Sequence, residues 1–168
     1  MDYSYVVLYQ SQTGNTRNIA ETMYKAIESE NKRLVDIDNT SNIPDADVYL
    51  VGFNIHNEIC SIDILDFLEQ ISGGYIALFS SCGFIPTEEY KAAIEKKICA
   101  WISEEVQYMG MYLCQGKVLE KQKTVMRQNM PDKAEILNRM FEIGDSHPDP
   151  QDYKNAVAFV KEIQTRIR

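Results

Sequence analysis

Basic residues are scarce in this sequence of 168 residues, which has 17 Lys and Arg against 25 Asp and Glu and a net charge of −8. A nucleic-acid binder needs clustered Lys and Arg to contact phosphates, and docking on anionic lipid needs the same residues. We therefore expect no nucleic acid and no membrane as a partner. The acidic surface suits a protein partner with a basic docking face, through electrostatic steering.

Metal-ligand spacing is also missing. The four cysteines form no C-x-x-C pair, and His56 and His147 have no ligand spacing with them. We expect free thiols in a reducing compartment and no metal ion. No signal peptide is evident, and no apolar run is long enough to span a bilayer. These absences and the length predict a cytoplasmic protein of one domain, residues 1–168.

Short apolar runs alternate with longer helical patterns along the chain. Strands are predicted at residues 5–9, 33–37, 47–53, 75–80 and 111–114. Helices are predicted from residue 16, from Ser61 to a stop at Gly73-Gly74, from a cap at Thr87 through Ile102, and from a cap at Asp149. This alternation predicts an α/β protein with a doubly wound five-stranded parallel sheet, order 2-1-3-4-5, and helices on both faces.

Residues 117–147 do not fit the alternation. They contain a helical stretch at residues 134–141 between polar loops. We interpret the segment as an insertion near the sheet edge and not as a second domain.

A doubly wound sheet binds its ligand beyond the carboxyl ends of the strands, at the point where the strand order reverses. This rule points to three loops, at residues 10–16, 54–61 and 80–87. The first reads Ser11-Gln12-Thr13-Gly14-Asn15-Thr16 and leads into a helix. It offers hydroxyls, a glycine and the N–H groups of a helix N-terminus, and it contains no acidic residue and no lysine. Such neutral donors can hold a phosphate monoester.

Other phosphate-binding or phosphorylated loops need residues that are absent here. A Walker loop needs G-x-x-x-x-G-K-S/T, and a dinucleotide-binding loop needs G-x-G-x-x-G after the strand. A receiver domain needs acidic residues at the end of the first strand, where Tyr9-Gln10 stand.

The first loop, residues 11–16, resembles the phosphate loop of the flavodoxin family, whose pattern is S/T-x-T-G-N/K-T. The resemblance covers roughly residues 4–86, and more loosely the last strand and helix. It implies a flavodoxin-like fold and bound FMN, with the phosphate on the first loop and the isoalloxazine ring between the other two. The implied ring contacts are Asn54, Ile55, His56 and Asn57 in the second loop and Ser80, Ser81, Cys82, Gly83 and Phe84 in the third.

The ring-binding loops depart from the family pattern, which commonly has a Trp in the second loop and a Tyr in the third. The only Trp, Trp101, falls in a predicted helix and is expected in the core. Phe84 is the best stacking candidate, although it could equally fill the core. Flavodoxins also flip a peptide of the second loop on reduction, which needs a residue that tolerates positive φ. Asn57 is the candidate for this hinge, and Asn54 is the second choice.

Cys114-Gln115-Gly116-Lys117 and His147-Pro148-Asp149-Pro150 resemble stretches of a subgroup of small flavodoxin-like proteins from anaerobic bacteria, some of which serve a dedicated reductase. No catalytic residue is assigned. The resemblance implies a monomeric electron carrier that delivers electrons to a redox partner, with an acidic rim around the flavin. Two alternatives stay open. One is an FMN-dependent NAD(P)H or quinone reductase whose residues 117–147 close over a substrate; the other is a binding module with weakened flavin affinity.

Overall fold

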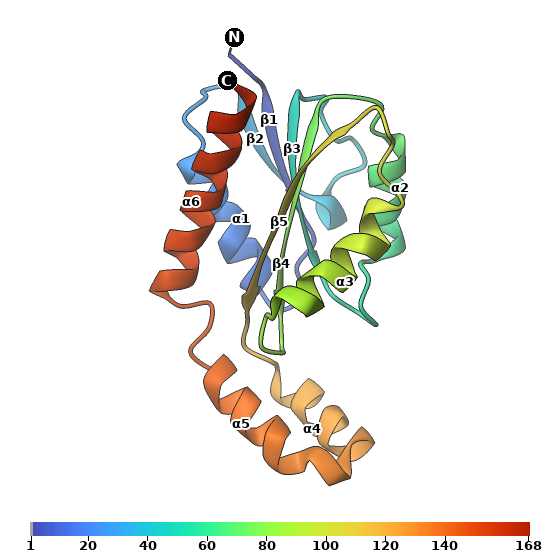
Figure 1. Ribbon diagram of the computed structural model, residues 1–168, viewed down its shortest axis with the longest axis vertical. Helices are drawn as coiled ribbons and strands as arrows, with labels where there is room; N and C mark the ends of the chain where they lie inside the picture. Colours follow the sequence, from blue (N-terminus) through green and yellow to red (C-terminus); the bar gives the residue numbers. More distant parts are fainter. Residues whose placement is uncertain (1) are drawn as a thin grey trace.

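Five parallel strands form one sheet in the order β2-β1-β3-β4-β5, as the sequence predicts (Figure 1). The strands are β1 (Tyr5–Tyr9), β2 (Lys32–Asp36), β3 (Val48–Asn54), β4 (Tyr75–Cys82) and β5 (Gln107–Gln115). This computed structural model describes residues 2–168. β1 is buried along its whole length, as expected for a strand covered on both faces, whereas β2 is half-buried at the edge. β5 is longer than predicted and has an irregular register against β4 at residues 76–78.

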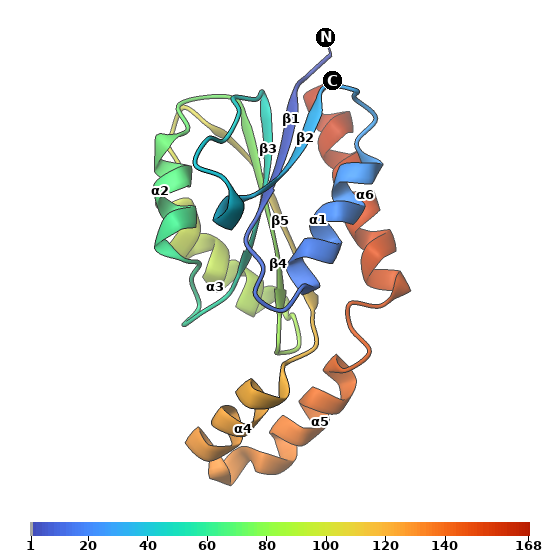
Figure 2. The same cartoon turned by 180° about the vertical axis from the view of Figure 1, so that it is seen from behind.

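Helices cover both faces of the sheet. α1 (Asn15–Ala26) and α6 (Pro150–Ile167) lie on one face, and α2 (Ile62–Gln70) and α3 (Glu88–Cys99) lie on the other (Figures 1 and 2). Each face has its own apolar core. Ile19, Met23 and Val160 belong to the first, and Ile64, Leu68 and Ile94 belong to the second. The sheet and these four helices therefore form one packed unit whose carboxyl edge is shaped by the connecting loops. No helix within residues 2–168 is long and apolar enough to cross a membrane.

The predicted caps at Thr87 and Asp149 and the predicted helix start at Ser61 are confirmed, but two predicted helix ends are wrong. The side chains of Ser61, Thr87 and Asp149 accept N–H groups in the first turns of α2, α3 and α6. α2 ends at Gln70, and the glycine pair follows it in the turn before β4, where Gly74 has φ 80°. α3 ends at Cys99, so Trp101 lies beyond it and is 40% exposed instead of buried in the core.

Residues 117–147 form a helical hairpin that extends beyond the carboxyl ends of the strands (Figures 1 and 2). The hairpin contains α4 (Glu120–Asn129), the short 3-10 helix η2 (Pro131–Lys133) and α5 (Ala134–Gly144); another 3-10 helix, η1 (Ile37–Asn39), follows β2. The sequence predicts one helix here and misses α4, which is mostly polar. The hairpin starts at edge strand β5, as expected, but it lies past the end of the sheet and not over its edge.

The hairpin has a small core and few attachments to the sheet. Val118, Leu137, Met140 and Phe141 form that core, and Lys123 is buried between Glu120 and Asp145, at 3.0 and 2.7 Å. The side-chain amide of Gln115 donates to Met140 O at 3.2 Å, and Lys117 N donates to His147 O at 2.9 Å. The second bond brings the two ends of the insertion together, which explains how it projects from an intact sheet.

Candidate functional site

The three predicted loops meet at the carboxyl edge of β1, β3 and β4 and line a cleft of about 110 Å³. This edge includes the point where the strand order reverses between β1 and β3, which is where the fold predicts a ligand. Most of the predicted site residues line the cleft: Gln12, Thr13, Asn15, Asn54, Ile55, His56, Ser81, Cys82, Gly83 and Phe84. Tyr90, Gly116, Lys117, Val118 and Gln122 complete the lining and were not predicted.

The first loop ends at a helix without a side-chain cap. Gly14 has φ 89° at the N-cap of α1, and no side chain bonds to the first turn from that position. α4 and α5 likewise lack a side-chain cap, whereas α2, α3 and α6 have one. Within the loop, Gly14 N donates to Ser11 Oγ at 3.1 Å and Asn15 N donates to Thr13 Oγ1 at 3.4 Å, and these bonds fix the turn. The N-terminus of α1 therefore offers N–H groups and a partial positive charge to an anion in the cleft.

Thr16 does not point into the cleft. It is fully buried, and its hydroxyl lies 3.3–3.5 Å from Ser81 Oγ, Asn54 Oδ1 and Phe53 O. The expected hydroxyl donor to phosphate instead links the first loop to the ends of β3 and β4. Ser80 is likewise buried and donates to Phe53 O. These contacts make Thr16 and Ser80 residues that hold the loops together.

The second loop is a tight turn. His56 and Ile59 exchange backbone hydrogen bonds of 2.8 and 3.0 Å, and the two residues between them have positive φ, 51° at Asn57 and 64° at Glu58. Positive φ at both central positions defines a type I′ turn. Asn57 thus adopts the left-handed conformation that the hinge hypothesis requires. Glu58 pairs with Lys97 of α3, which ties the tip of the turn to that helix.

The third loop presents an aromatic residue to the site. Phe84 is 42% exposed, so it does not fill the core, and its ring meets that of Tyr90 edge-on at 6.2 Å. Cys82 is buried, and its thiol donates to Phe84 O at 3.2 Å. Burial raises the pKa of Cys82 to about 12, and burial together with the charges of Cys82 and Glu58 raises the pKa of Tyr90 to about 12. Both side chains therefore keep their protons at neutral pH.

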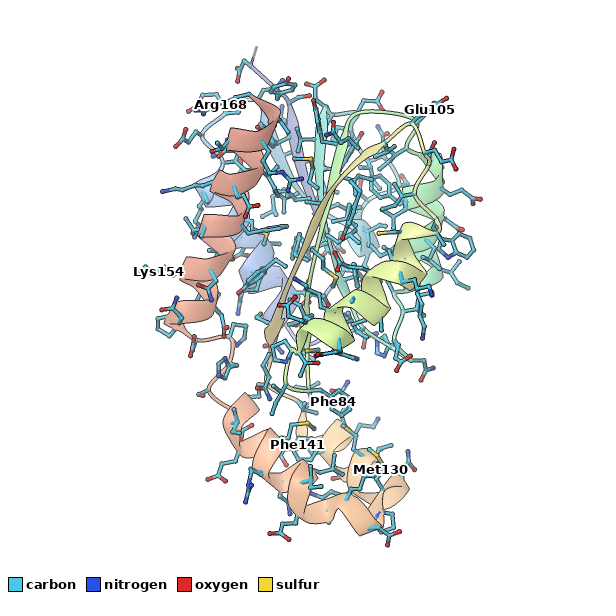
Figure 3. The ribbon with its side chains drawn as sticks, in the orientation of Figure 1. Phe84, Glu105, Met130, Phe141, Lys154 and Arg168 are labelled. Atoms are coloured by element: carbon cyan, nitrogen blue, oxygen red, sulfur yellow. The ribbon has the colours of Figure 1, made fainter. Side chains whose placement is uncertain are left out.

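A wider groove of about 690 Å³ continues from the cleft toward the hairpin. Figure 3 shows Phe84 between the end of the sheet and the hairpin that carries Phe141 and Met130. The walls of the groove are the two ring-binding loops and one side of α4. They include Ile55, His56, Asn57, Gly83, Phe84, Val118, Leu119, Lys121, Gln122, Val125 and Met126. The stretch Cys114–Lys117, which resembles a subgroup of flavodoxin-like proteins, leads directly into the α4 side of the groove. It was the one feature of the sequence that pointed to this side of the site.

The lining of the site differs in charge from the protein as a whole. Lys117 lines the cleft and Lys121 lines the groove, and the lining of either cavity includes no carboxylate. Neither lysine forms an ion pair within residues 2–168. Carboxylates lie near the site but outside both linings: the charge of Glu58 acts on Tyr90, and the charge of Lys117 acts on Asp145. The residues that line the site carry positive charge on an otherwise acidic protein.

A cluster of His147, Asp149 and Asp152 lies outside the site, where the hairpin leads into α6. Asp149 and Asp152 form a reciprocal capping box at the start of α6, and His147 Nδ1 lies 2.5 Å from Asp152. The capping box and the contact of His147 with Asp152 explain why these three side chains lie close together.

Comparison with known proteins identifies the family. The model of the flavodoxin domain matches residues 6–161, so the chain belongs to the flavodoxin family. This confirms the predicted family and fold and supports FMN as the cofactor.

The chain is 32% identical over 170 residues to the flavodoxin-like domain-containing protein BilS of Clostridioides difficile (strain CD3), with 96% of each chain covered. Among solved structures, the flavodoxin of Streptococcus pneumonia TIGR4 has a TM-score of 0.60 at 13% identity and covers 96% of this chain and 98% of its own. A Lactobacillus acidophilus NCFM flavoprotein solved in complex with FMN has a TM-score of 0.52 at 16% identity, covering 66% of this chain and 93% of its own.

Proposed function

We propose that this chain binds FMN non-covalently and carries electrons to a redox partner protein. The observation that carries the proposal is the position of the α1 N-terminus, with Gly14 at its N-cap, beside a cleft lined by all three loops at the switch point of the sheet. The C. difficile relative and the FMN-bound structural neighbour support the same cofactor.

The residues present fit FMN. Gln12, Thr13 and Asn15 line the polar end of the cleft beside the α1 N-terminus, where a phosphate would accept hydrogen bonds. The apolar walls of Ile55 and Phe84 suit the faces of a flavin ring. When bound, FMN supplies one-electron and two-electron redox chemistry, and the protein contributes binding, orientation and electrostatics.

The visible spectrum of the purified protein tests the proposal directly. A flavin spectrum, either as purified or after adding FMN and removing the excess, is the expected result. A protein that stays colourless after FMN is added would support the third possibility, a binding module with weakened flavin affinity, which the missing Trp and Tyr motivate. Reduction of the flavin followed by oxidation with ferricyanide tests electron transfer itself.

One observation favours a second candidate, a flavin-dependent reductase. α4 closes one side of the groove, as a segment that covers a substrate would. Steady-state oxidation of NADH or NADPH with a quinone acceptor separates the two candidates. Turnover without an added reductase indicates an enzyme, and its absence with intact FMN binding indicates a carrier. The partner of a carrier is proposed to be a protein, and the carrier itself is proposed to be a monomer.

A further inference from the structure

The cleft and the groove are one continuous space, because six residues line both: Ile55, His56, Gly83, Phe84, Val118 and Gln122. The cleft beside the first loop measures about 110 Å³. Pockets for drug-sized ligands measure roughly 300–1,000 Å³, and FMN is a ligand of this size. The cleft alone would hold only part of FMN, and the adjoining groove of about 690 Å³ has room for the remainder.

The wall of the groove formed by α4 contains exposed apolar side chains beside Lys121 and Gln122. Leu119 and Val125 line it and are 45% and 47% exposed, and Phe84 lines it from the third loop at 42%. A large apolar side chain left open to solvent in a concave site is a common feature of ligand pockets. The faces of an isoalloxazine ring would match the apolar residues of this wall, which adjoins the cleft beside the first loop.

The linker before α4 closes on the first loop. Asn15 Nδ2 donates to Lys117 O at 3.0 Å, and a Cβ atom added at Gly116 would lie 2.6 Å from Asn15 Nδ2. Lys117 lines the same cleft as the first loop, is exposed, and forms no ion pair among the described residues. Besides the hydrogen bond from Lys123, the charge of Lys117 also lowers the pKa of Asp145 in the hairpin. A lysine that lines the cleft beside the first loop would attract a phosphate bound there.

We propose that residues 116–126 form a third wall of the FMN site. In this wall, Lys117 provides a countercharge to the phosphate, and Leu119 and Val125 cover the ring in place of the aromatic residues that flavodoxins commonly use. The inference rests on the FMN-binding function proposed above. It assigns to this segment a role in affinity and in selection of FMN over riboflavin, which lacks the phosphate.

The countercharge is tested with Lys117→Gln, which removes the charge and keeps most of the side chain. FMN and riboflavin are titrated into flavin-free protein, and binding is followed by flavin fluorescence at low and high salt. FMN binding should weaken about threefold to fivefold at low salt, the effect of losing one exposed ion pair, and less at high salt. Riboflavin binding should not change. Lys154→Gln is the matched control, because Lys154 is exposed on α6, away from the site (Figure 3), and should affect neither flavin.

The apolar wall is tested with the double variant Leu119→Gln, Val125→Thr. Both side chains are half-exposed, so the fold should tolerate the changes, and thermal unfolding of the flavin-free protein checks this. FMN and riboflavin binding should both weaken about threefold to tenfold, since both ligands carry the ring. Ile136→Thr is the control, because Ile136 is 69% exposed on α5 and lines neither cavity.

The outcomes separate this inference from the proposed function. If the wild-type protein binds FMN and neither set of variants alters its affinity, the third wall is wrong while the flavin-binding function stands. Equal losses of FMN and riboflavin in Lys117→Gln would also overturn the countercharge, because they would indicate a general disturbance of the site. If the wild-type protein binds no flavin, the proposed function fails and the third wall fails with it.

Discussion

Replacing Thr16 by Val should lower the stability of the protein and should weaken FMN and riboflavin binding to a similar extent. The Thr16 hydroxyl is fully buried and lies 3.3 Å from Ser81 Oγ and 3.4 Å from Asn54 Oδ1. Valine has nearly the same shape but no hydroxyl, so the change removes these contacts without creating a cavity. The first loop loses its polar link to the ends of β3 and β4, on which both flavins would depend.

The magnitude follows from the geometry. A buried hydrogen bond contributes about 1 kcal/mol, and the long distances here argue against the upper end of the range. For a domain of this size, about 1 kcal/mol lowers the unfolding temperature by roughly 2–4 °C. Thermal unfolding of the flavin-free protein measures the stability change, and fluorescence titration measures both affinities. Thr13→Val is the comparison, because Thr13 lines the cleft and its loss should weaken FMN more than riboflavin.

The opposite pattern would refute this reasoning. If Thr16→Val left the unfolding temperature unchanged and weakened FMN alone, the Thr16 hydroxyl would face the phosphate, as its place in the flavodoxin motif suggests.

Three other sites and the hairpin give further predictions. Phe84→Ala should raise the fluorescence of bound FMN and weaken its binding with little change in unfolding temperature, because Phe84 is 42% exposed; a large drop in that temperature would mean a core role. Hydrogen bonds from Ser4 N and Oγ lower the pKa of Asp47, so its charged form stabilises the fold above the ordinary pKa of 3.8, and this contribution disappears as the pH falls below that value. Asp47→Asn should thus cost about 1 kcal/mol or less in urea unfolding at pH 7 and progressively less as the pH falls below 3.8; a cost that does not change with pH would show that the charge of Asp47 does not stabilise the fold. Replacing residues 120–144 by a short linker should leave a folded sheet domain by circular dichroism but weaken FMN binding, and unfolding would show that the sheet depends on the hairpin. Asn57→Val should strain the type I′ turn, where Asn57 has φ 51°, by about 1–3 kcal/mol; unchanged urea unfolding would mean that the turn relaxes without cost.

The sequence determined the fold because the signals for it are local. The central strands β1, β3 and β4 each begin with an apolar run, and the caps at Ser61, Thr87 and Asp149 each depend on residues three positions away. The handedness of crossovers then restricts the strand order to a few forms, of which 2-1-3-4-5 is observed. The phosphate-loop motif was equally readable, because it lies within six consecutive residues. Trp101 was misplaced because helical periodicity does not show that α3 ends two residues before it.

Tertiary structure alone decided which way the loop residues point and what closes the site. The direction of Thr16 depends on polar groups at the ends of β3 and β4, which come 37 to 65 positions later in the chain. The backbone of Lys117 contacts Asn15 in the first loop across 102 positions of sequence, and the linker at Gly116 packs against the same residue before α4 begins. Periodicity and capping report how a residue lies within its own element, and they contain no information about distant surfaces that pack against it. The sequence therefore determined the sheet and its phosphate loop, whereas folding in three dimensions placed a cationic, partly apolar wall over them.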